Sequence, residues 1–241
     1  MVFDYQSYIN LFELLKENNY EFSDYHNWES KEKCVILRHD IDNDITKAEE
    51  LAEIEFDYHV ASTYFVLISS DFYNTFSHKN VSSLRRIKQL GHQIGLHFDE
   101  MNYPEIAGNK EDVKQAIIME AHVLQDAIGI PIESFSYHRP SKCILQENLE
   151  IPGMVNSYSD RFFHGFKYLS DSRRSWREPV EEIIRSNRYD RLHILTHAFW
   201  YNTKEISMAE TLIRFIQSAE NERKKTLSEN LTNYEEALGG C

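Results

Sequence analysis

Two carboxylates stand at the end of an apolar run in the first quarter of the sequence. Residues 34–42 read Cys-Val-Ile-Leu-Arg-His-Asp-Ile-Asp and end in Asp40 and Asp42. Alternate side chains of an extended segment share a face, so both carboxylates point the same way, with Arg38 on that face too. Burying two carboxylates is costly unless a cation or a reaction uses them. The pair therefore predicts a metal site or an acid–base site.

Three further apolar runs end in the same kinds of residue: His97 and Asp99, His138 and Arg139, and His197. One Asp with one or two His and open coordination positions suits zinc, or manganese, iron or cobalt. Such a metal polarises a carbonyl and lowers the pKa of bound water, while a spare carboxylate acts as general base. The chemistry that we expect is hydrolysis of an amide or ester.

Each of these residues also has a structural explanation. An Asp after a strand commonly caps the next helix, which we expect for Asp44. A lone His is more often a hydrogen-bonded structural residue than a ligand, and we apply that interpretation to His39 and His92. His97 and His197 differ, because both stand at strand ends beside further polar residues.

Strand and helix patterns alternate along nearly the whole chain. The expected strands cover 34–42, 61–68, 92–98, 132–137, 154–158, 166–169 and 192–196, and the expected helices cover 5–18, 44–58, 80–90, 111–128, 178–186 and 207–222 or beyond. This alternation is typical of a parallel sheet with helical crossovers, in which reacting groups sit at the carboxyl ends of the strands. We therefore expect the α/β class, with a closed or nearly closed barrel.

Composition limits the classes of partner. The net charge of −13 argues against general affinity for nucleic acid or an anionic membrane, and no apolar stretch is long enough for membrane insertion. Cys34, Cys143 and Cys241 are an odd number without CxxC spacing, so neither a disulfide framework nor a thiolate zinc site is indicated. We expect a cytoplasmic protein; the sequence leaves its oligomeric state open.

Five short motifs resemble, in order and approximate spacing, those of the polysaccharide deacetylase family (NodB homology, carbohydrate esterase 4). They are residues 38–42 (Arg-His-Asp-Ile-Asp), 61–66 (Ala-Ser-Thr-Tyr-Phe-Val), 91–97 (Gly-His-Gln-Ile-Gly-Leu-His), 137–140 (Tyr-His-Arg-Pro) and 195–197 (Leu-Thr-His). The resemblance covers roughly residues 35–201. It implies a distorted (β/α) barrel. We expect a single domain over 1–241, closed by a C-terminal helix at about 207–235 that the helical pattern predicts.

The resemblance also implies an activity and its catalytic residues. The activity is metal-dependent removal of an acyl group, such as acetyl, from an N-acylated sugar or a surface-polysaccharide precursor. Asp40 resembles the catalytic base, Asp42 the metal-binding Asp and His97 the first metal His. His197 resembles the general acid towards the leaving amine, and Asp171 resembles the acid that tunes this His.

A second group of residues resembles the parts of the family that orient the base and bind the sugar. Arg139, or His138 in strict register, resembles the Arg that orients the base. Trp176 resembles the aromatic residue that shapes the cleft. Aromatic side chains that can stack on a sugar ring, or equally belong to the core, are Tyr137, Trp176, Phe199 and Trp200.

One position departs from the family pattern. The family has a second metal His where this sequence has Met101, and a thioether is a poor ligand for a hard divalent ion. Asp99 is the first expected substitute, because it would share a face with His97, and His138 is the second, reaching across from the neighbouring strand.

Two other functions remain open at this point. One is a non-catalytic barrel that has lost its metal and binds a sugar or a partner protein. The other is a metal-dependent hydrolase of a different substrate, such as a small amide or a phosphoester.

Overall fold

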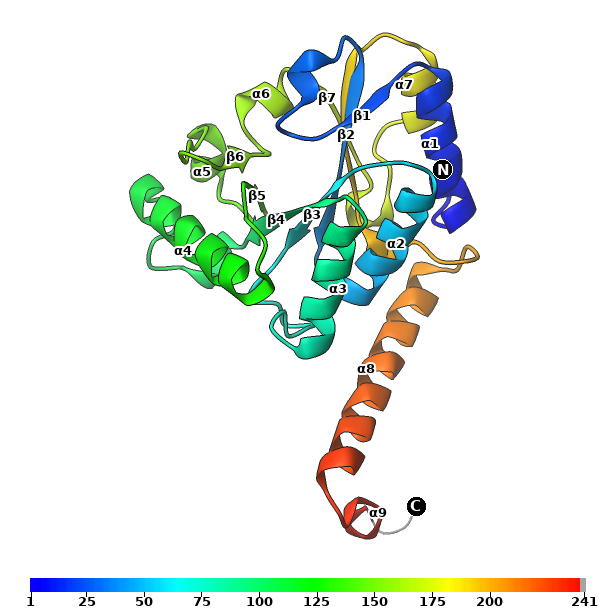
Figure 1. The fold of residues 1–241 in the computed structure, drawn as a ribbon, viewed down its shortest axis with the longest axis vertical. Coiled ribbons are helices and arrows are strands. Elements are labelled where there is room, and N and C mark those ends of the chain that lie inside the picture. Colours follow the sequence, from blue (N-terminus) through cyan, green and yellow to red (C-terminus); the bar gives the residue numbers. More distant parts are fainter. Residues whose placement is uncertain (239–241) are drawn as a thin grey trace.

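The chain is built around one curled parallel sheet, seen in a computed structural model that describes residues 1–238 (Figure 1). Its strands are β1 (Glu21–Ser23), β2 (Cys34–Ile41), β3 (Thr63–Val66), β4 (Gln93–Phe98), β5 (Ser134–Tyr137), β6 (Val155–Asn156), β7 (Lys167–Ser170) and β8 (Arg191–Thr196). The order across the sheet is β6-β5-β4-β3-β2-β8-β7, with β1 beside the start of β2, and all pairs are parallel.

Helices connect the strands and cover the sheet. They are α1 (Tyr5–Glu17), α2 (Ile45–Asp57), α3 (His78–Gln89), α4 (Lys110–Ile128), α5 (Lys142–Gln146), α6 (Asp160–Phe163), α7 (Val180–Arg185), α8 (Met208–Asn230) and α9 (Tyr234–Ala237), with 3₁₀ segments η1 (Trp28–Ser30), η2 (Glu100–Asn102), η3 (Ser172–Arg174) and η4 (Ala198–Trp200). Asp44 caps α2, as predicted: its Oδ1 accepts a hydrogen bond from the Thr46 N–H at 2.8 Å.

The predicted α/β class is confirmed, and so is the distorted barrel of parallel strands. The barrel is open, because no pairing joins β6 to β7 within residues 1–238. Each strand and helix range predicted from the sequence contains or overlaps an observed element. Strand β1 and the short helices α5 and α6 were not predicted, since segments this short carry no apolar period.

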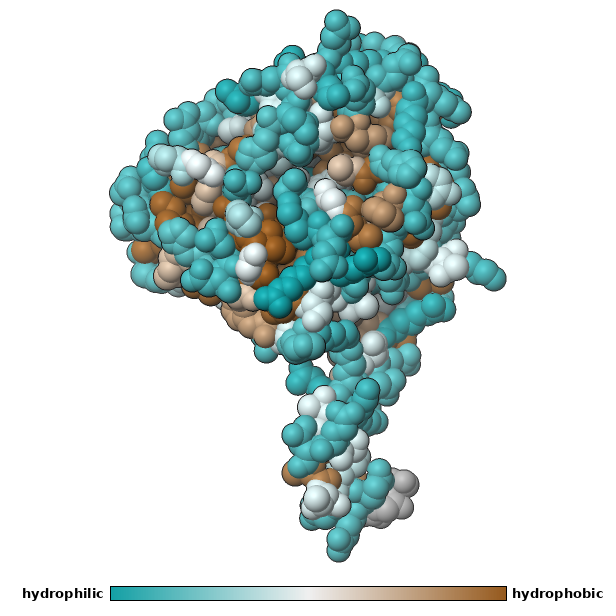
Figure 2. All heavy atoms as spheres, in the orientation of Figure 1, coloured by the Kyte–Doolittle hydropathy of each residue, from teal (hydrophilic) through white to brown (hydrophobic). Residues whose placement is uncertain are grey.

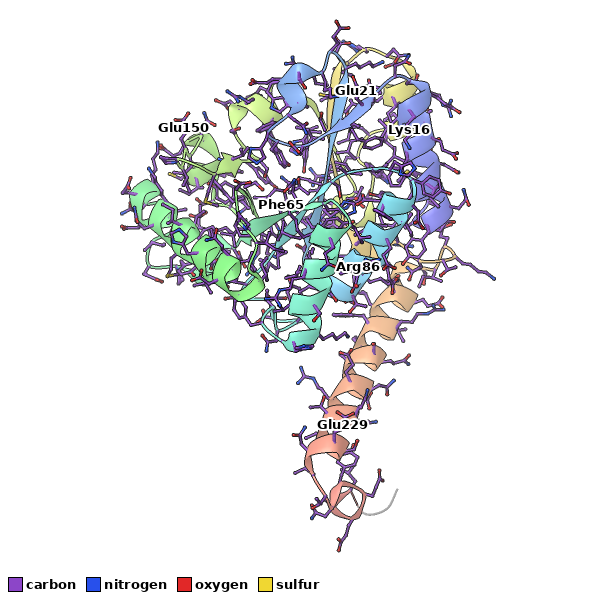
Figure 3. All side chains as sticks on the ribbon, viewed as in Figure 1. Lys16, Glu21, Phe65, Arg86, Glu150 and Glu229 are labelled. Atoms are coloured by element: carbon purple, nitrogen blue, oxygen red, sulfur yellow. The ribbon has the colours of Figure 1, made fainter. Side chains whose placement is uncertain are left out.

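The two faces of the sheet pack separately. On β2, Val35 and Leu37 belong to the main core with the helices, while Cys34 and Ile36 belong to a second cluster around Phe65. Figure 3 labels Phe65 at the centre of the body. A Cβ on Gly95 would lie 2.5 Å from the Phe65 ring, so only glycine fits on β4 there. This alternation places Arg38 and Asp40 on the same face as Phe65.

Helix α8 extends away from the body, and its far half is mostly hydrophilic (Figures 1 and 2). Near its start, Phe215 contacts Phe199 and Phe72, with ring centroids 5.1 and 5.7 Å apart. Across the described part of the chain, none of the helices is long and apolar enough to cross a bilayer. Cys34 and Cys143 are free thiols, and Cys241 lies outside the described residues.

Candidate metal centre

Three side chains from three different strand ends meet at the carboxyl edge of the sheet. Asp42 follows β2, His97 lies in β4 and His138 follows β5. Asp42 Oδ1 lies 3.2 Å from His97 Nε2 and 3.2 Å from His138 Nδ1, and the two imidazole nitrogens are also 3.2 Å apart. The three atoms therefore form a nearly equilateral triangle.

This triangle fits a divalent cation. Neighbouring ligands of tetrahedral zinc, each at about 2.0 Å from the ion, are roughly 3.3 Å apart. Asp42 Oδ1 is buried and makes no hydrogen bond, although two imidazole nitrogens lie beside it. Two imidazoles and one carboxylate are donors that zinc, manganese, iron and cobalt accept. The sequence expectation of a divalent-metal site is thus supported, and His138 supplies the third candidate donor.

The outer contacts of the cluster suit a metal site with an open side. His97 is buried, and its Nδ1 lies 2.6 Å from the Ser136 hydroxyl of the paired strand. Metal-binding imidazoles commonly use their second ring nitrogen in this way, which fixes the tautomer and the ring orientation. The side chains of Asp42 and His138 are each 25 % exposed, so solvent reaches the cluster.

The imidazoles also set the charge of Asp42. Burial by itself raises the pKa of this carboxyl group, but contacts with His138 and His97 outweigh burial and hold the pKa well below its usual range. Asp42 is therefore ionised at neutral pH, the state that a metal ligand requires.

Asp40 lies next to the cluster and is buried. Its Oδ2 is 3.8 Å from His97 Nε2 and accepts a hydrogen bond from Arg38 Nη2 at 2.8 Å. Its Oδ1 is buried without a hydrogen-bond partner. One carboxylate oxygen is thus held by an arginine while the other is free to act as an acceptor.

His197, which is partly exposed, and the buried Asp171 form a hydrogen-bonded dyad on another side of the cluster. The Nδ1 of His197 lies 2.6 Å from Asp171 Oδ1, and its Nε2 lies 3.8 Å from Asp42 Oδ2. Burial alone lowers the pKa of His197, but the attraction of Asp171 outweighs it and raises the pKa to about 9. His197 therefore carries a proton on Nε2 at neutral pH, directed towards the cluster.

Asp99, the first expected substitute for the missing His, lies outside the cluster. The Arg139 side chain binds both of its oxygens, with Nε 3.1 Å from each, and its Oδ1 also accepts a hydrogen bond from the Met101 N–H. The chain turns into η2 directly after β4, so Asp99 serves as an N-cap residue instead. Met101 is 62 % exposed.

Arg139 also differs from its expected role. It is committed to Asp99, whereas the guanidinium beside Asp40 belongs to Arg38. The strict-register alternative, His138, is part of the triangle with Asp42 and His97.

The aromatic residues that were candidates for sugar stacking lie in different places. Tyr137 is a correction: it is buried in the main core, because its position on β5 alternates with Ser136, which faces the site. Trp176 is half-buried and lines a surface hollow with Met1 and Val180. Trp200 is half-buried against Phe199 in η4, soon after His197.

Two polar residues near the site were not predicted. Ser136 orients His97, and Ser157 accepts a hydrogen bond from Arg38 Nη1 at 2.7 Å. Strand alternation was the available signal for Ser136, since it stands two residues before His138. Ser157 follows a strand of two residues, which the sequence pattern did not locate sharply.

Comparison with solved structures shows the fold. An esterase of carbohydrate esterase family 4 from Streptococcus mutans matches with a TM-score of 0.50 at 15% identity, covering 85% of this chain and 86% of that one. A family 4 acetyl xylan esterase from Clostridium thermocellum, in complex with a cobalt ion, gives 0.46 at 18% identity and covers 78% and 84%. A family 4 pseudoenzyme from Bacillus anthracis gives 0.47 at 14% and covers 80% and 62%.

The chain thus has the fold of a family 4 carbohydrate esterase at low sequence identity, which agrees with the resemblance seen in its motifs. No protein-family model matches the sequence, and no curated protein matches it.

Proposed function

We propose that the chain is a divalent-metal-dependent hydrolase that removes an N-acyl group, in the first instance acetyl, from a sugar or a surface-polysaccharide precursor. The observation that carries this proposal is the position of an acid–base pair around the metal triangle. Asp40 and protonated His197 each lie within 3.8 Å of a side chain of the triangle.

The metal would be held by Asp42, His97 and His138. A bound divalent ion supplies a Lewis acid that polarises the acyl carbonyl and lowers the pKa of water. Zinc is our first choice, with manganese, iron and cobalt as alternatives, because the donor set of two imidazoles and one carboxylate suits all four.

The side chains around the metal then divide the proton transfers of amide hydrolysis. Asp40 accepts a proton from the attacking water through its free Oδ1. His197 donates the proton on Nε2 to the departing nitrogen, and Asp171 stabilises the imidazolium that precedes this step. An ion pair between Arg38 Nη2 and Asp40 Oδ2, 2.8 Å apart, holds the base beside the triangle.

The choice of an acylated sugar rests on the fold shared with family 4 esterases and on the motif resemblance. Trp200 and Trp176 remain candidates for contact with the sugar. A precursor carried on a nucleotide or a lipid would suit a cytoplasmic enzyme.

Acetate release and bound metal test the proposal directly. The substrates are N-acetylated hexosamines, free and nucleotide-linked, with small amides and a phosphoester as a comparison panel. We expect the wild type to release acetate from the sugars, Asp40→Asn to retain metal but lose at least about 100-fold in kcat, and His97→Ala to lose both metal and activity.

The outcomes separate the competing functions. Equal acetate release by all three proteins would contradict the assignment of the site. A wild type that holds no metal and hydrolyses nothing would favour a binding protein. Turnover of the small amides alone would indicate that the substrate is a small amide and not an acylated sugar.

A further inference from the structure

We infer that Arg38 is the positioning residue for the catalytic base, the role that the motif resemblance gave to Arg139. The inference rests on the proposed function, since Asp40 needs positioning only if it acts as a base. Its sequence signal is the two-residue spacing on β2, which places the guanidinium and the carboxylate on one face of the strand.

The guanidinium of Arg38 is fixed from several sides. Nη2 donates to Asp40 Oδ2 at 2.8 Å and Nη1 donates to Ser157 Oγ at 2.7 Å. The Tyr158 hydroxyl lies 3.4 Å from Nη2, and the guanidinium lies 4.9 and 5.3 Å from the ring centroids of Tyr158 and Phe65. The side chain is fully buried. An arginine held in this way can keep a carboxylate in one rotamer.

The second arginine at this end of the sheet does not compete for Asp40. Arg139 is about half exposed and binds both oxygens of Asp99. This ion pair lies at the turn that follows β4, where Asp99 precedes η2. The two arginines therefore have separate carboxylate partners.

Positioning by Arg38 leaves a defined oxygen for chemistry. Because Oδ2 of Asp40 is occupied by the guanidinium, Oδ1 is the atom that remains without a partner. A small displacement of a catalytic group can cost about 100-fold in rate. Loss of the hydrogen bond from Arg38 should consequently lower kcat rather than weaken substrate binding.

A double-mutant cycle on kcat tests the coupling between Arg38 and Asp40. Lysine keeps the charge but cannot make both hydrogen bonds, so we expect Arg38→Lys to lower kcat by about 10- to 100-fold with KM and metal content unchanged. In the Asp40→Asn background the same change should cause no further loss. A parallel cycle of Arg139→Lys with Asp40→Asn should show no such coupling.

Three further variants guard against misfolding. Ser157→Ala removes one anchor of the guanidinium without leaving a buried charge, and should lower kcat by a smaller factor. For Arg38→Met and Asp40→Asn, the double variant should have a higher thermal midpoint than Arg38→Met alone, because it no longer buries an unpaired carboxylate.

The results distinguish this inference from the proposed function. An active wild type whose Arg38→Lys variant keeps full kcat, or loses the same factor with and without Asp40, would overturn the inference alone. A wild type that hydrolyses none of the acylated sugars and holds no metal would overturn the proposed function and this inference with it.

Discussion

His197 differs from the other imidazoles of the site because a fully buried carboxylate, Asp171, lies behind it. That contact raises its pKa to about 9, so the proton needed by a leaving amine is present at neutral pH. His97 and His138 instead direct ring nitrogens at Asp42 Oδ1, as ligands would. Neighbouring imidazoles are thus suited to different chemistry because their partners differ.

Replacing Asp171 tests the general acid. The acid form of His197 predominates below pH 9, so activity should fall as pH rises through about 9. Asp171→Asn removes the attraction that raises this pKa, so the basic limb of the kcat profile should move to lower pH. At pH 8 the variant should lose about 10- to 100-fold in kcat. A pH–rate profile with an unmoved basic limb would contradict the role of the dyad.

The sequence could predict that acids and imidazoles gather at one edge of the sheet, because parallel strands end at the same edge. Their exact grouping was not predictable, because it depends on how the chain turns after each strand. Asp99 follows β4 into a turn and becomes a cap paired with Arg139, whereas His138 follows β5 and stays beside His97. Sequence spacing alone does not distinguish these two turns.

Helix α2 is tied to the sheet by a buried carboxylate, Glu55. Its oxygens accept hydrogen bonds from the hydroxyls of Tyr8, Ser62 and Tyr64, and its Oε1 lies 2.7 Å from His39 Nε2. Since His39 stands beside Asp40 on β2, this network fixes the strand that carries the proposed base. The expected structural role of His39 agrees with these contacts.

Glu55→Gln should lower stability in a pH-dependent way. Burial alone raises the pKa of Glu55, but the His39 imidazole and the surrounding donors lower it from 4.5 to about 2. A depressed pKa contributes stability above pH 4.5 that is lost as pH falls towards 2. The free energy of unfolding of the wild type should therefore exceed that of the variant by about 3 kcal/mol at pH 6. This difference should shrink below pH 4.5. Urea unfolding at several pH values measures it; a constant difference would contradict the network.

The long helices and strands were predictable because their apolar periods are regular, as in residues 34–41 and 110–128. In the stretch from 141 to 166 only the strand at 154–158 was predictable, because the helices α5 and α6 are five residues long or shorter. Ser157, which accepts a hydrogen bond from Arg38, lies in this stretch, so the environment of the proposed base emerged only from the three-dimensional structure.

At the scale of the molecule, the site and helix α8 are separate parts. The sheet edge holds the candidate site, whereas α8 extends outward, and Glu229 lies near its end (Figure 3). Only Thr211 of α8 is buried, and residues 220–230 are all exposed. The helical pattern predicted this helix, but not its direction, which depends on the anchoring of Phe215 on Phe72 and Phe199.

Removing residues 224–241 should leave the body intact. The removed part of α8 is exposed, so we expect the free energy of unfolding to change by less than about 1 kcal/mol and metal content to stay the same. Thermal unfolding and elemental analysis measure both. A larger loss of stability would show that this part of α8 contributes to the folded body.

The most direct test of the account is the metal content of three purified proteins: the wild type, His138→Ala and Asp99→Asn. If Asp42, His97 and His138 hold the ion, the wild type binds about one divalent ion per chain, His138→Ala loses it, and Asp99→Asn keeps it. A metal-free wild type after growth in metal-replete medium, a His138→Ala variant that retains the ion, or its loss in a folded Asp99→Asn variant would contradict the account.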